Sequence, residues 1–151
     1  MEEVDRAIIA ALTADGRLSY TDLAEKVGLS VSAVHQRVRR LEQRGVITGY
    51  TARVSFDALE LPLTAFVAVR PFDPSQPDDA PERLAHLPEI ESCYSVAGED
   101  NYLLLVRVAS PADLERVLQE IRTSASVTTR TTVVLSTPYE SRPPRISRPA
   151  R

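Results

Sequence analysis

The stretch from Leu23 to Ile47 constrains this chain more than any other, because two short helical patterns meet there at a glycine. Ser19, with Asp22 three residues later, predicts the start of the first helix, and Gly28 predicts its end. Ser30 is placed to cap a second helix. The apolar stripe of that helix consists of Val34, Val38 and Leu41, which share one face. Together these signals predict a helix-turn-helix.

The opposite face of the second helix is polar. At ~100° per residue it presents Ser32, Gln36, Arg39, Arg40 and Gln43, with His35 at its edge. Glutamine pairs with adenine edges, and arginine pairs with guanine or with phosphates. A solvated face on an ordinary helical hairpin is the alternative, but the apolar and glycine spacing favours DNA binding. The expected DNA-binding residues are Ser32, His35, Gln36, Arg39, Arg40 and Arg44.

The net charge of −3 is distributed unevenly along the chain. Residues 1–54 carry eight basic and seven acidic side chains, whereas residues 55–139 carry six basic and thirteen acidic ones. The tail from Glu140 carries four arginines and one glutamate. We therefore expect one end of the chain to meet DNA and the middle to repel it.

The lack of membrane and signal segments and the single cysteine limit the class of protein. No apolar run reaches membrane-spanning length and no signal pattern precedes the first helix, so we expect a cytoplasmic protein that contacts no membrane. Cys93 is the only cysteine, which excludes a disulfide within one chain and a zinc cluster. With two histidines, and with Cys93 interpreted as a small core residue, we expect no enzyme, no metal and no cofactor.

The segments on either side of the helix-turn-helix complete a first domain, expected over residues 1–54. An apolar stripe before it predicts one more helix and consists of Val4, Ala7, Ile8, Ala11 and Leu12. After it, Val46 to Val54 is expected to be extended. This segment is either the wing of a winged helix-turn-helix or the linker to a second domain.

From Pro62 onward the hydrophobic period changes to two, which is typical of strands. The expected elements are, in order, a strand at 63–70, a short helix capped by Asp78 or Asp79 and holding Leu84 and Leu87, strands at 90–98 and 102–109, a helix after Ser110 and a strand at 127–136. This order is the ferredoxin-like βαββαβ arrangement. The sequence thus predicts an α+β protein whose second domain covers residues 55–137.

The strand over 102–109 is apolar on both faces, with Leu104, Val106 and Val108 on one and Leu103 and Leu105 on the other. Two helices cover only one face of a four-stranded sheet. The second face would be a large exposed apolar patch in a monomer. We therefore expect a homodimer in which a second copy covers it.

The run LAEKVGLSVSAVHQRVRRLEQRGVITGY, followed by a βαββαβ domain containing VAGEDNYLLLVRV, resembles the leucine-responsive and asparagine-regulator (Lrp/AsnC) family of transcription factors. The resemblance extends from about Val4 to Leu135. It implies a DNA-binding domain and a C-terminal RAM or ACT-like domain, with dimers that assemble further, often to octamers. It also implies an amino-acid effector held between dimers, near the loop Gly98, Glu99, Asp100, Asn101 and Tyr102.

This loop departs from the family pattern at Asn101, a position that is frequently aspartate in the family. An amide hydrogen-bonds an amino group but supplies no charge. Either Asp100 substitutes for the missing acid, or the site prefers another ligand or has weakened. A plain hairpin turn is the alternative interpretation of the loop.

A different class of function also fits the sequence. The chain could be a metabolite-binding or assembly module whose helix-turn-helix makes protein contacts. Steep salt dependence of binding would identify DNA, because phosphate neutralisation releases counterions. The basic, proline-rich tail over 138–151 is expected to be disordered.

Overall fold

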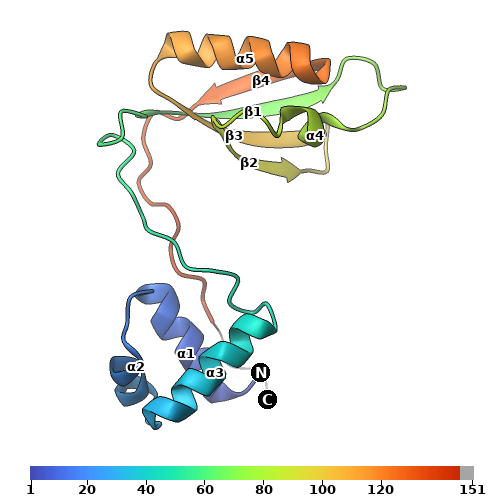
Figure 1. Ribbon diagram of the computed structural model, residues 1–151. Helices are drawn as coiled ribbons and strands as arrows, with labels where there is room; N and C mark the ends of the chain where they lie inside the picture. Colours follow the sequence, from blue (N-terminus) through green and yellow to red (C-terminus); the bar gives the residue numbers. More distant parts are fainter. Residues whose placement is uncertain (147–151) are drawn as a thin grey trace. The chain divides into compact units, whose positions relative to one another are not determined.

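A computed structural model describes residues 1–146 of the chain (Figure 1). The described residues divide into two compact units, one formed by residues 1–53 with 139–146 and the other by Val54–Pro138. Residues 138–146 contain no helix or strand, and the rest of the predicted disordered tail lies outside the described residues. Within residues 1–146, no helix has the length and apolar character needed to span a lipid bilayer.

The N-terminal unit contains three helices, α1 (Glu3–Ala14), α2 (Tyr20–Val27) and α3 (Val31–Gln43). Their shared core is fully apolar and consists of Ile8, Leu23, Ala24, Val34, Val38 and Leu41. Each of these side chains is at most 4% exposed. The predicted three-helix unit is confirmed, but in the predicted α1 stripe Ala7 is exposed, and Ile9 packs against the core instead.

The turn between α2 and α3 forms as the sequence predicts. The Ser19 hydroxyl accepts a hydrogen bond from the Asp22 N–H at 3.0 Å. Gly28 has a φ of 70°, in the left-handed region that a glycine adopts without a steric penalty. Ser30 then accepts the Ala33 N–H at 3.2 Å and starts α3. Two serine caps and one glycine therefore set the angle at which α3 leaves α2.

The segment after α3 is a linker and not a strand. The N–H groups of Val46 and Ile47 both bond to the Leu41 carbonyl, at 2.9 and 3.2 Å, and so close the end of the helix. From there to Leu61 the structure contains turns and irregular chain. Of the two interpretations that the sequence left open for 46–54, the linker is the one that the structure supports.

The C-terminal unit is a four-stranded antiparallel sheet with two helices. Its elements are β1 (Leu63–Pro71), α4 (Ala80–Leu84), β2 (Ile90–Ser95), β3 (Tyr102–Val108), α5 (Pro111–Ala125) and β4 (Val127–Val133). The strand order is β2-β3-β1-β4. This order confirms the ferredoxin-like arrangement.

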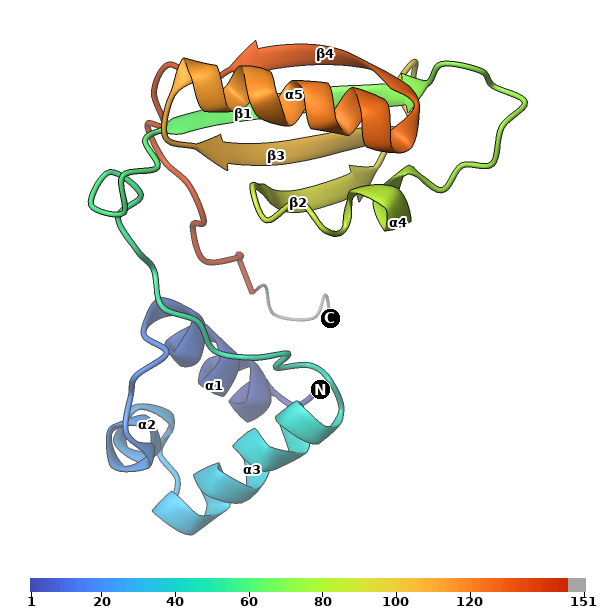
Figure 2. The same cartoon turned by 45° about the horizontal axis from the view of Figure 1, so that its top comes forward.

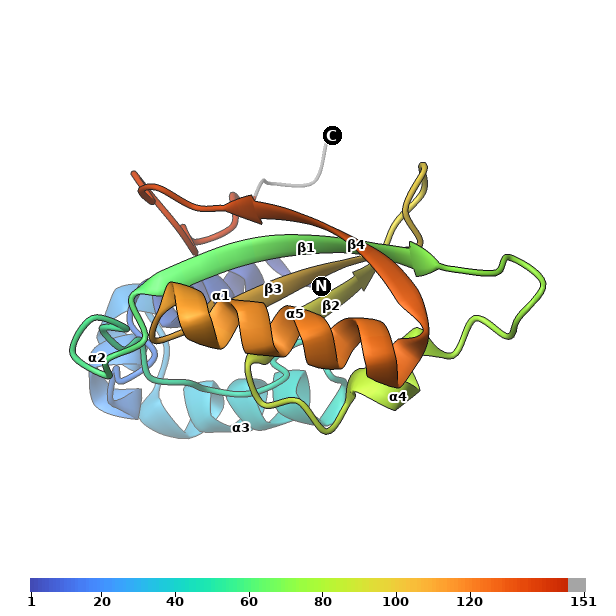
Figure 3. The same ribbon diagram turned by 90° about the horizontal axis from the view of Figure 1, so that it is seen from above.

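Both helices lie on one side of the sheet, as Figures 2 and 3 show. Beneath them, alternate residues of β1 and β3 are fully buried: Ala65, Val67, Val69, Leu104, Val106 and Val108. On the opposite face, Phe66 pairs with Leu105 and remains 38% exposed, and Tyr94 beside Leu103 is 53% exposed. The two-faced apolar character predicted for β3 is confirmed.

Several predicted boundaries in this unit were wrong. Helix α4 ends at Leu84, so Leu87 lies beyond it. Pro88 follows and disfavours helical backbone at the residue before it. Asp79 precedes the helix without capping it, because its carboxylate binds the Arg83 guanidinium at 2.9 Å. Strand β4 stops at Val133, where its pairing with β1 ends at Ala65.

Replacing Gly28 with alanine tests the left-handed turn. A β-carbon at a φ of 70° is strained, so we expect Gly28→Ala to lower the free energy of unfolding by about 1–2 kcal/mol. Gly49→Ala is the control, because Gly49 has no positive φ and an added β-carbon there meets nothing within 4 Å. Urea unfolding measures both variants. Equal stability of the two would show that the turn carries no strain.

Candidate functional site

The polar face of α3 is open to solvent. Ser32, His35, Gln36, Arg39, Arg40 and Arg44 are all exposed, on the opposite side of the helix from the buried stripe. The His35 ring also meets Tyr20 of α2 edge-on, with 4.9 Å between ring centroids. The structure therefore brings together on one surface all six residues predicted to bind DNA.

The arginines of this region differ in their partners. Arg37 forms ion pairs with Asp5 in the first turn of α1 and with Glu2 at its N-cap, both at 2.8 Å. Arg40 is farther from the same carboxylates, at 3.8 and 4.0 Å. Within residues 1–146, no side chain binds Arg39 or Arg44. These two guanidinium groups retain their hydrogen-bonding capacity for an anionic partner.

Asp5 is a buried acid in the first turn of α1, with its side chain only 3% exposed. Burial raises the pKa of this carboxyl, but the hydrogen bonds from Arg37 and from the Glu2 N–H, with the charges of Arg37 and Arg40, outweigh it. The pKa of Asp5 therefore lies below its usual value of 3.8. A buried carboxylate held in this way ties α1 to α3 and fixes the position of the exposed face.

The loop between β2 and β3 contains the five residues predicted to bind an effector. Gly98 has a φ of 153°, and the backbone of Asn101 is held between two strands. The Asn101 N–H donates to the Val69 carbonyl at 2.9 Å, and its carbonyl accepts the Val96 N–H at 3.0 Å. Tyr102 begins β3. The loop is thus anchored to the end of β1.

Two polar side chains of this loop, those of Asp100 and Asn101, already have partners. Asp100 pairs with Arg130 of β4. The Asn101 amide donates to an oxygen of Asp78, which precedes α4, at 3.2 Å. Burial raises the pKa of Tyr102 most, and the charge of Asp78 and a hydrogen bond to it raise this pKa further. Asp78 is therefore the acid closest in its interactions to Asn101 and Tyr102.

A groove of about 460 Å³ opens where β1 ends and β4 begins. Its charged and polar lining consists of Arg70, Gln76, Asp78, Glu99, Asn101 and Thr128, and Phe72 adds an aromatic wall. The volume lies within the range of about 300–1,000 Å³ that small-molecule sites occupy. Glu99 and Asn101 bring the predicted effector loop into this groove. It combines a guanidinium with two carboxylates, as a zwitterionic ligand requires.

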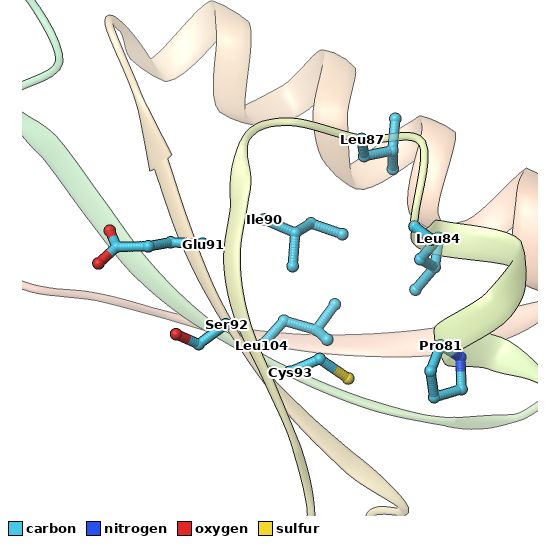
Figure 4. A pocket seen from close by; sticks show the side chains of 9 residues that line it. Pro81, Leu84, Leu87, Ile90, Glu91, Ser92, Cys93 and Leu104 are labelled. Carbon is cyan, nitrogen blue, oxygen red and sulfur yellow. The ribbon is translucent and has the colours of Figure 1, made fainter. Parts of the chain in front are cut away.

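A smaller cavity of about 230 Å³ lies between α4 and β2 (Figure 4). Leu84, Leu87, Ile90 and Leu104 converge on it, whereas the Glu91 and Ser92 side chains point away. Cys93 faces this cavity on an edge strand, and its exposure corrects the prediction of a core residue. Burial, with the charge of Glu82, raises the pKa of its thiol. The apolar lining suits a charged ligand less well than the groove does.

The sequence predicted neither Asp5 nor the lining residues Arg70 and Asp78 as parts of a site. Asp5 stands 32 positions before Arg37, and Asp78 stands 23 positions before Asn101. Side-chain pairs across such separations leave no periodic pattern. An acid directly beside the apolar Val4 of a helical stripe was the one available signal for Asp5.

Comparison with known proteins places the two units in one family. A winged helix-turn-helix DNA-binding model matches residues 1–48, and the Lrp/AsnC ligand-binding domain matches residues 64–144. The chain belongs to the Lrp/AsnC family. It is a DNA-binding transcription regulator with a ligand-binding domain.

Individual Lrp/AsnC proteins resemble it over most of their length. The HTH-type transcriptional regulator LrpA of Mycobacterium tuberculosis is 58% identical over 142 residues, which cover 94% of this chain and 95% of that protein. The leucine-responsive regulatory protein of Escherichia coli is 36% identical over 89% of this chain and 85% of its own. A feast or famine regulatory protein from M. tuberculosis complexed with L-methionine superposes with a TM-score of 0.91. It is 58% identical, and the match covers 93% and 96% of the two chains.

The Lrp/AsnC relationship confirms the expected fold and the expected resemblance. It agrees with the exposed polar face on α3 and with a ligand groove in the second unit. The matched relatives are transcription regulators. The family models assign domains, and they leave the individual DNA-binding and effector-binding residues of this chain as predictions.

The buried Asp5–Arg37 pair has a measurable pH dependence. We expect Asp5→Asn to lower the free energy of unfolding by about 1–3 kcal/mol at neutral pH, because an amide cannot pair with Arg37. Since folding lowers the pKa of Asp5, its contribution is complete above about pH 4 and is lost as pH falls through the lowered value.

Thermal unfolding as a function of pH measures this difference, with Glu25→Gln as control. Glu25 is an exposed acid of α2 with no side-chain partner among the described residues. The difference in unfolding temperature between wild type and Asp5→Asn should become smaller below about pH 4. A gap that stays constant into acid would exclude the ionised carboxylate as its source.

Proposed function

We propose that this regulator binds an imperfect palindrome through α3 of two copies. The observation that carries the proposal is the exposed polar face of α3, on which Arg39 and Arg44 have no partner in the described chain. Gln36 and Arg39 read base edges, and Ser32 and His35 assist them. Arg40 and Arg44 bind phosphates. Half-sites lie a whole number of helical turns apart, ~10 base pairs or a multiple.

Fluorescence anisotropy on DNA from the protein's own upstream region tests this function directly. Binding should resist competition by scrambled DNA and should weaken steeply as salt rises. The titration is repeated with each common amino acid, so that one experiment tests both recognition and sensing. Binding that shows no preference over scrambled DNA and little response to salt would favour an assembly module instead.

Alanine variants of α3 separate base reading from phosphate binding. We expect Gln36→Ala or Arg39→Ala to relax specificity at one operator position by ~1–3 kcal/mol. Arg44→Ala should weaken all sequences alike and reduce the salt slope by about one, because it removes a phosphate contact. Anisotropy against single-base operator variants measures both effects. If Arg44→Ala relaxed specificity at one position and the Gln36 or Arg39 variant weakened all sequences alike, Arg44 would read a base and the other residue would bind phosphate.

We infer a homodimer from the uncovered face of the sheet. Phe66, Leu103 and Leu105 lie there side by side with Tyr94, and the helices occupy the other face. One end of this face is closed by Phe56, whose ring lies 3.6 Å from the Arg107 guanidinium. A second copy would bury the remaining apolar patch and supply the second α3. Dimers then assemble further, to an octamer, as the family resemblance implies.

Sedimentation velocity at micromolar concentration tests the dimer. The wild type should sediment as a dimer or larger, and Leu103→Glu should shift it toward the 16.7 kDa monomer, because a charge at the interface is costly to bury. Gln119→Glu adds the same charge on the exposed side of α5 and should leave the assembly intact. A wild type that sediments only at 16.7 kDa would contradict the dimer.

We also propose an amino-acid effector, bound near Gly98, Glu99, Asp100, Asn101 and Tyr102. The support is the groove that this loop lines, together with the L-methionine complex of the M. tuberculosis relative. The effector changes operator binding and is not chemically converted, so the protein acts as a regulator and not as an enzyme. We place this regulator in the cytoplasm. It needs no cofactor for this role.

A further inference from the structure

The groove beside the effector loop has a specific charge requirement. An α-amino acid carries a carboxylate and an ammonium group, and burying either one without a partner is costly. Within residues 1–146, Glu99 is the one acid of the loop without a side-chain partner. Asn101 is neutral, and the Asp100 carboxylate is already paired with Arg130. Glu99 and an acid from another segment are therefore the two candidates for binding the ammonium group.

Asp78 is in the position to be this acid. It lines the groove, and the Asn101 amide donates to its Oδ2 at 3.2 Å. Burial and the charge of Asp78 both raise the pKa of Tyr102. A carboxylate has about four acceptor sites, so the bond from the Asn101 amide orients Asp78 and leaves room for an ammonium group. A carboxylate that is already oriented loses less conformational entropy on binding.

Glu99 lines the same groove, but it differs from Asp78 in how it is held. Both acids are exposed, but no side chain within residues 1–146 binds Glu99, whereas Asp78 accepts a hydrogen bond from Asn101. Fixing a free glutamate against a ligand costs side-chain entropy, which Asp78 has largely lost already. Arg70 is the guanidinium in the lining, and it offers the fork that matches a carboxylate.

We propose that Asp78 supplies the negative charge that Asn101 lacks: Asp78 binds the ammonium group of an α-amino acid, and Arg70 binds its carboxylate. Asn101 acts as a positioning residue that holds Asp78. The segment before α4 would thus supply the acid that the loop lacks at Asn101. This inference rests on the proposed amino-acid effector, and it assigns one binding residue to each of the two charged groups of that ligand.

Isothermal titration calorimetry on the full chain tests the assignment. The twenty common L-amino acids are screened against wild type, and the tightest is carried forward with its 2-hydroxy-acid analogue, which lacks the ammonium group. Asp78→Asn should weaken the amino acid about 10- to 100-fold. The 2-hydroxy acid should bind wild type weakly, because it has no ammonium group for Asp78 to bind. Asp78→Asn should bind the amino acid and its 2-hydroxy-acid analogue with similar affinity. Arg70→Gln should weaken both ligands.

The exchange variant Asp78→Asn/Asn101→Asp provides the decisive comparison. It keeps one carboxylate and one amide in the pair but reverses their places, so affinity should recover to within several-fold of wild type. Asp79→Asn is the matched control, because this neighbouring acid is paired with Arg83 and does not line the groove. It should bind like wild type.

The outcomes separate this inference from the function on which it rests. Wild type that binds none of the amino acids overturns the effector proposal and the assignment together. Wild type that binds one of them, with Asp78→Asn binding it equally well, overturns the assignment alone. If Glu99→Gln lost more affinity for the amino acid than Asp78→Asn did, Glu99 and not Asp78 would be the residue that binds the ammonium group. Circular dichroism confirms that each variant is folded.

Discussion

Strand β3 has apolar side chains on both faces, and the two helices of its unit cover only one of them. This constraint organises the C-terminal unit. Leu104 and its inward neighbours build the core with α5, while Leu103 and Leu105 remain on the outer face. The same strand begins at the loop that closes the ligand groove. Core, outer apolar face and groove therefore share one element, and a shift of β3 by one residue would exchange the two faces.

Local signals made the helix-turn-helix predictable. Ser19, Gly28 and Ser30 act on backbone groups within three residues, so their effects can be derived without knowing the rest of the fold. The strands followed from period-two patterning in the same way. Their order then limited the second unit to one familiar arrangement, which the structure confirms.

Contacts between distant residues were not predictable from pattern. Arg37 lies on the same helix as the arginines predicted to bind DNA, and only the fold shows that Asp5 and Glu2 bind it. Cys93 looked like a core residue because it is small and lies inside a predicted strand, yet that strand is at the edge of the sheet and Cys93 is exposed. At the groove, the loop residues were predicted, whereas Asp78 and Arg70 required the tertiary arrangement of three segments.

The capture of Arg37 has a further consequence for affinity. It removes one cation from each DNA-binding domain, so a single domain gains less from phosphate neutralisation. Two such domains joined in one assembly gain far more, because binding of the first raises the effective concentration of the second at its half-site. In the proposed dimer, occupancy of the operator depends on avidity, and assembly and DNA binding are thermodynamically linked. A ligand that altered the association of subunits would control transcription without touching α3.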